Sequence, residues 1–164
     1  MSSTPFQSKD PDAPLLSGEL QSLVVLTEGD RADAEGSPLV RNFCDLSRTS
    51  RGDDALKAHD LAYSCRGLLN AIRITEKLID YVNGNWQRFG HAQIAYGMVE
   101  GQKWFLRNAS DEFQQALAAS PWPASTREVL DVYDRVGRTL DDCKALSSTI
   151  SNHIGLSVDP QQTS

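Results

Sequence analysis

The residues best suited to chemistry in this chain are its three histidines and three cysteines, and they lie far apart. They are His59, His91, His153, Cys44, Cys65 and Cys143. A metal site on a helix needs ligands three or four positions apart, supported by thiolates or carboxylates. The nearest such combination, His59 with Cys65, spans six positions. We therefore predict no metal site and no cofactor.

His59 lies in a short motif, Ala58-His59-Asp60-Leu61. This motif resembles the A-H-x-L core of histidine phosphotransfer domains, which are helical bundles with a solvent-facing histidine on a long helix. The resemblance implies that His59 carries a phosphoryl group. The family's lysine and glycine, three and four positions after the histidine, are replaced here by Ala62 and Tyr63. Phosphotransfer through His59 is one alternative function.

Motifs of the common enzyme classes are missing from the sequence. There is neither a G-x-S-x-G nucleophile motif nor a glycine-rich phosphate loop. The paired carboxylates Asp53-Asp54 and Asp141-Asp142 are adjacent in sequence, so on a helix they point in different directions. We predict that the protein is not an enzyme and has no catalytic residues.

Three long segments show the apolar periodicity of helices. Between residues 53 and 82 the spacings alternate between three and four, and Asn83-Gly84-Asn85 is predicted to end this helix. Residues 91–119 form the second segment, which ends before two prolines. A capping box, Ser125 to Glu128, opens the third, which ends at Gly155. We call the residues expected to face the core of the bundle the seam of each segment. The first seam is Ala58, Leu61, Cys65, Leu68, Ile72, Thr75, Ile79 and Val82, and the second is Ile94, Met98, Phe105, Ala109, Phe113, Ala116 and Leu117. The third seam is Val129, Tyr133, Val136, Leu140, Cys143, Ser147, Ile150 and Ile154.

Long helices joined by short connections run antiparallel to their neighbours. We therefore predict an all-α fold, an elongated antiparallel three-helix bundle over residues 51–156. The same period is compatible with self-association into a larger bundle. Sequence alone leaves the monomer and the homo-oligomer both open.

The first 50 residues differ from the rest in composition. They hold four cations, eight anions and four prolines, without sustained periodicity. Such a segment cannot bury enough apolar surface to offset its ordering entropy. We predict a flexible acidic leader over 1–50, with one candidate strand at 22–27, and a disordered tail over 157–164.

A candidate surface for a protein partner comes from glycines and aromatics in the second helical segment and its approach. Gly97 and Gly101 each cost a helix interior up to about 1 kcal/mol relative to alanine. Close packing of a neighbouring helix side chain, such as Tyr133 or Leu140, would offset that cost. A groove that admits a partner helix or a ligand is the alternative. The candidate partner-binding residues are Trp86, Tyr96, Gly97, Gly101 and Trp104.

Composition limits the partners further. The chain has 164 residues and a formal charge of −6, which opposes binding to nucleic acid or an anionic membrane. No apolar stretch is long enough to cross a bilayer or to form a secretory signal. Three widely spaced cysteines favour a reducing compartment, hence the cytoplasm, with export by a route other than Sec as an alternative.

The function we predict is a non-catalytic protein-interaction or regulatory module that binds a protein partner. Besides phosphotransfer through His59, two further alternatives stay open. A small-ligand sensor predicts an apolar cavity near Gly97 and Gly101. A secreted effector directed by its leader is compatible with the composition of residues 1–50.

Overall fold

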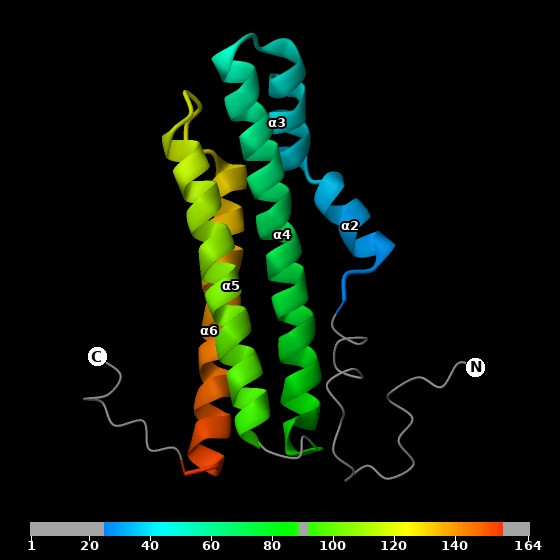
Figure 1. The fold of residues 1–164 in the computed structure, drawn as a ribbon, viewed down its shortest axis with the longest axis vertical. Coiled ribbons are helices and arrows are strands. Elements are labelled where there is room, and N and C mark those ends of the chain that lie inside the picture. The colour runs from blue at the N-terminus through cyan, green and yellow to red at the C-terminus, as the bar shows by residue number, and fades with distance from the viewer. Residues whose placement is uncertain (1–24, 89–91, 156–164) are drawn as a thin grey trace.

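The computed structural model describes residues 25–88 and 92–155 and shows only helices there (Figure 1). The predicted all-α class is therefore confirmed for these residues. The helices are α2 (Glu28–Glu35), α3 (Pro38–Thr49), α4 (Asp53–Asn85), α5 (Ala92–Ala118) and α6 (Arg127–His153), and the short 3-10 helix η1 (Trp86–Arg88) follows α4.

The long helices α4, α5 and α6 lie side by side along the longest axis of the molecule, each antiparallel to the next (Figure 1). The 33 residues of α4 give it a length of roughly 50 Å. The predicted seams of α4 and α6 are largely correct, because almost all of their members are buried or half-buried. Leu61, Leu68 and Ile72 of α4 have no exposed surface.

The exact three-helix description is wrong, because α2 and α3 form within the segment predicted to be a flexible leader. Pro38 occupies the first turn of α3, where a missing N–H costs nothing. Leu39, Val40 and Phe43 then lie on one face and are buried. The Phe43 ring meets Phe113 of α5 edge-on, with centroids 6.1 Å apart. A 12-residue helix is marginally stable on its own, so α3 is stabilised by packing its apolar face on the bundle.

Other predictions for the ends of the chain fall partly or wholly outside the described residues. The first half of the candidate strand at 22–27 lies outside the described residues, as do the rest of residues 1–24 and the tail at 157–164. Residues 25–27 have no strand assignment, and Thr27 is instead the N-cap of α2. Its side chain accepts a hydrogen bond from the Asp30 N–H (3.1 Å).

The buried side chains form two clusters along the bundle. The α3-end core lies where α3 covers α4, α5 and α6, and the far-end core lies among the three long helices alone. The α3-end core includes Phe43, Leu61 and Phe113. The far-end core includes Val82, Val99 and Ile150. The bundle therefore has four helices at one end and three at the other.

One predicted helix end is confirmed and one predicted helix start needs correction. Asn83-Gly84-Asn85 ends α4 as predicted, because the helix stops at Asn85 after 33 residues and the buried Trp86 continues the chain into η1. Thr126, not Ser125, is the N-cap of α6, and its side chain makes no capping hydrogen bond. The end of α6 is as predicted, since Gly155 follows it with φ 68°.

Candidate interaction surface

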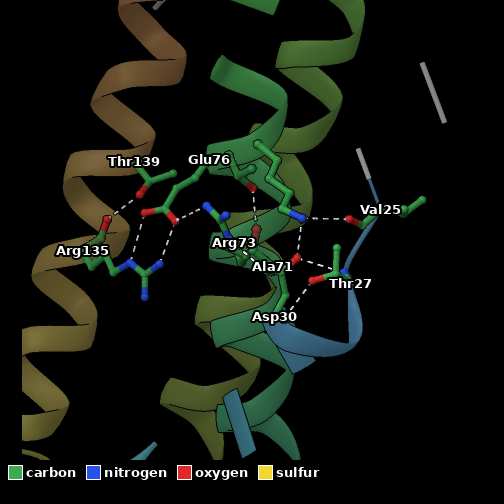
Figure 2. A network of polar contacts seen from close by, with 10 residues as sticks. Val25, Thr27, Asp30, Ala71, Arg73, Glu76, Arg135 and Thr139 are labelled. Atoms are coloured by element: carbon green, nitrogen blue, oxygen red, sulfur yellow. Dashed lines mark hydrogen bonds and ion pairs between the residues drawn. The ribbon is translucent and has the colours of Figure 1, made fainter. Parts of the chain in front are cut away.

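The most extensive polar cluster joins α2 to α4. The buried Asp30 carboxylate accepts hydrogen bonds from the Thr27 N–H (2.9 Å), from Arg73 Nε (3.0 Å) and from the Lys77 ammonium (Figure 2). The ammonium of Lys77, the Thr27 N–H and the Arg73 guanidinium hold the pKa of Asp30 well below its usual range. Asp30 is therefore an ionised anchor for α2.

A second carboxylate extends this cluster to α6. Glu76 of α4 accepts two hydrogen bonds from the Arg135 guanidinium, at 2.7 and 3.1 Å, and lies 3.8 Å from Arg73 (Figure 2). Paired, forked geometry of this kind orients the helices that carry it. Because both acids of the cluster are engaged by bases, we assign it to positioning α2, α4 and α6 rather than to chemistry.

Two of the three thiols belong to the cores. Cys65 and Cys143 are fully buried, and burial raises their pKa to about 12 and about 11, respectively. Neither thiol is a thiolate nucleophile at neutral pH. Cys44, on α3, is half-buried.

His59 is exposed on α4, near the end where four helices meet. Within the described residues it makes no hydrogen bond or ion pair. Lys57, two positions earlier, lies 3.8 Å from Asp53. Ala62 is buried and Tyr63 is exposed, so the positions of the family's lysine and glycine supply no cation. His59 is accessible, as phosphotransfer requires, but lacks that charge partner.

The predicted core face of α5 is wrong in part. Phe113 and Leu117 are buried as expected, but Ile94 and Phe105 point outward with 51% and 61% of their surface exposed, next to Trp104, which is 59% exposed. The smaller Ala95, Val99 and Leu106 face the bundle instead. Small residues let α5 approach α4 and α6 closely at the far end, and this leaves the larger side chains outside.

Five exposed, uncharged residues in the first half of α5 form one stripe, which we call the α5 outer face. Its members follow the three-and-four spacing of a single helix face, and none is charged. The Trp104 and Phe105 rings contact one another edge-on, with centroids 5.4 Å apart. The α5 outer face consists of Ile94, Gly97, Gly101, Trp104 and Phe105.

The predicted close packing at the two glycines is wrong. A Cβ placed on Gly97 or Gly101 would meet no atom within 4 Å, so neither Tyr133 nor Leu140 approaches them. Gly67 of α4 and Gly137 of α6 also face open space. The glycines of α5 are shallow gaps in its outer face, not contacts inside the bundle. They do not form the walls of an enclosed ligand cavity either.

The other two candidate partner-binding residues lie elsewhere. Trp86 is buried at the far end of the bundle, where its ring packs edge-on against His153 with centroids 4.8 Å apart. Tyr96 is half-buried and lines a groove between α5 and α6. Only Gly97, Gly101 and Trp104 of the original five share one face. Ile94 and Phe105, which periodicity assigned to the core, complete it.

The groove beside the α5 outer face is open and has a volume of about 580 Å³. Lys103 lines it and pairs with Glu100 (2.9 Å), which also accepts a hydrogen bond from Ser147 (2.8 Å). Arg107 and Lys144 line it too, and within residues 25–88 and 92–155 neither takes part in an ion pair. One border of the α5 outer face is therefore basic.

Metal-ligand clusters and membrane-spanning helices were sought in the described residues. No group of three or more histidine, cysteine, aspartate or glutamate side chains could hold a metal ion there. In the same residues, no helix combines the length and apolar character needed to cross a membrane.

Comparisons of the chain with protein-family models, with curated proteins and with solved structures give no match.

Proposed function

We propose that this protein is a non-catalytic interaction module and that a protein partner docks on the α5 outer face. The observation that carries the proposal is the exposure of Ile94, Trp104 and Phe105 on one uncharged stripe of a packed helix. Contiguous apolar patches on soluble proteins mark interaction sites. Aromatic side chains are also enriched at the energetic centres of interfaces.

The glycines support the same reading. Each exposed glycine inside a helix costs up to about 1 kcal/mol relative to alanine, and no neighbouring side chain uses the space that it leaves. A helix from a partner could place its own side chains in those gaps, while Trp104 and Phe105 pack on either side. The features that destabilise the free bundle are then contacts in the complex.

The other candidate groups for chemistry support a binding role rather than catalysis. Asp30 and Glu76 are held by bases that link helices, and Cys65 and Cys143 are buried with raised pKa values. Each of these groups stabilises the fold. The α5 outer face, by contrast, has no such structural role among the described residues.

Affinity capture with the full chain tests the proposal. The bait carries either the wild-type sequence or the double substitution Trp104→Ala and Phe105→Ala. The matched control replaces Leu56 and Tyr63 of α4, which are 66% and 70% exposed, by alanine. We expect a partner that binds wild type and control but binds the α5 variant at least about tenfold more weakly. A partner retained equally by all three baits would overturn the proposal.

The exposure of His59 at the four-helix end favours phosphotransfer as a second candidate function. Incubation with a small phosphoryl donor should then give an acid-labile label on the wild-type chain. His59→Gln should abolish the label, whereas His153→Gln should leave it intact. A chain that takes up no label, or a label that survives His59→Gln, would exclude this candidate.

A further inference from the structure

We infer that the α5 outer face binds a second copy of this chain, with the two α5 helices antiparallel about a two-fold axis beside Gly101. The inference rests on the proposed function of this face as a docking surface. The partner on this face is identified as the same chain because the large side chains of Trp104 and Phe105 and the gaps at Gly97 and Gly101 alternate along one helix.

The stripe is complementary to itself. In an antiparallel pair centred on Gly101, each residue lies opposite the residue equally far on the other side of the centre. Phe105, four positions after Gly101, then faces Gly97 of the other copy, four positions before it. Trp104, three positions after Gly101, lies opposite Met98, which is half-buried and packs partly against the far-end core. Symmetry repeats each contact, so the two Phe105 rings fill the gaps at the two Gly97 residues.

Glycine at the centre allows the two helices to come close. Packed helices lie about 8–10 Å apart, at a distance set by the side chains at the crossing point. A Cβ on Gly101 would meet nothing in the single chain, so the space above its backbone is free for the second helix. The crossing point of the dimer is therefore open in the monomer.

Charge does not oppose this contact, although each copy has a formal charge of −6. The charged groups nearest the centre, Glu100 and Lys103, neutralise one another at 2.9 Å. Arg107 is six positions from Gly101, so the two copies of Arg107 are separated by roughly 18 Å along the helix axis. That separation exceeds the Debye length of about 8 Å at physiological ionic strength.

The size of the stripe indicates the strength of the dimer. From Ile94 to Phe105 the face is about 17 Å long. It offers on the order of 500 Å² on each copy, which places the pair at the lower limit for a specific interface. We therefore expect a reversible dimer with a dissociation constant of roughly 1–100 µM.

Analytical ultracentrifugation of the full chain over that concentration range tests the inference. Wild type should pass from monomer to dimer. Gly101→Arg should raise the dissociation constant at least about tenfold, because the long side chain occupies the crossing point. Gly137→Arg on α6 is the matched control, since it too enters open space, and it should dimerise like wild type. Circular dichroism should show all three chains equally helical.

Three results would overturn the inference. The first is a wild type that stays monomeric throughout, and the second is a dimer that Gly101→Arg does not weaken. The third is a monomer in which Trp104 is shielded from an aqueous quencher, which would assign the face to another segment of the same chain. A monomeric wild type leaves the proposed function to be decided by affinity capture with the Trp104 and Phe105 variant, so the two failures are distinguishable.

Discussion

The side of the bundle under α3 and the outer face of α5 have similar side chains but opposite surroundings. Leu39, Val40 and Phe43 of α3 are buried against the bundle, whereas Trp104 and Phe105 of α5 are mostly in solvent. The chain supplies its own cover for the first surface. The described residues supply none for the second. The comparison shows that apolar residues in this protein serve two purposes, closure of the fold and a surface for docking.

The largest expected effect comes from the covered side. Phe43→Ala should lower the free energy of unfolding by about 3–5 kcal/mol, because it leaves a cavity beside Phe113. Phe105→Ala, the matched change on the α5 outer face, should cost about 0.5 kcal/mol or less. Urea unfolding of the full chain measures both. Equal losses from the two variants would remove the distinction between the two surfaces.

Glycines sharpen the comparison, with smaller effects of opposite sign. Gly52 joins α3 to α4 with φ 60° and ψ −130°, a conformation that other residues avoid. Gly52→Ala should therefore destabilise by about 1–3 kcal/mol. Gly101→Ala should stabilise by about 0.5–1 kcal/mol, because its Cβ enters open space on a helix. Thermal unfolding checks both signs, and a destabilising Gly101→Ala would mean that the gap is already filled.

The same comparison extends to acid through Asp30, the buried carboxylate that anchors α2 to α4. The pKa of Asp30 is lowered in the folded chain, so its stabilisation is complete above the unfolded value of about 4 and is lost as pH falls through the folded value. Asp30→Asn should lower the free energy of unfolding at neutral pH. It should also make that free energy fall less steeply than in wild type as the pH is lowered. Asp33→Asn, an exposed acid on the same helix, should leave the wild-type profile unchanged. Urea midpoints between pH 7 and pH 3 measure this difference.

The smallest effect distinguishes binding from folding. The double substitution Trp104→Ala and Phe105→Ala should leave the free energy of unfolding of the monomer within about 1 kcal/mol of wild type, as exposed positions usually do. It should nevertheless weaken self-association at least about tenfold. Unfolding at a concentration well below the dissociation constant isolates the first quantity. A decrease of several kcal/mol in the free energy of unfolding of the monomer would mean that Trp104 and Phe105 are core residues.

The parts of the fold predicted from sequence are those with a single apolar face. The seams of α4 and α6 are one-sided, so the three-and-four spacing identified their buried residues. In the first half of α5 two faces are apolar, and the spacing alone predicted that the face with Ile94 and Phe105 is buried. That face is exposed. Tertiary packing buries Ala95, Val99 and Leu106 in that half of the helix instead.

Short helices and distant ion pairs leave weaker traces in a sequence. The apolar residues Leu39, Val40 and Phe43 of α3 follow a helical spacing, but the prolines and acidic residues of the first 50 positions resemble a disordered segment in composition. Asp30 meets Arg73 and Lys77 across 43 and 47 positions of sequence, a separation that no local pattern reveals. Of the candidate site, sequence identified Gly97, Gly101 and Trp104 but could not separate Trp86, which is buried in the far-end core by residues distant in sequence.

The central claim is that the α5 outer face is covered by protein when the chain is in use. A photo-crosslinking residue placed at position 101 tests it in living cells, with the same residue at position 137 on α6 as the control. We expect a defined crosslinked product from position 101, either a dimer of this chain or a complex with one other protein, and none from position 137. No product from position 101, or the same products from both positions, would contradict it.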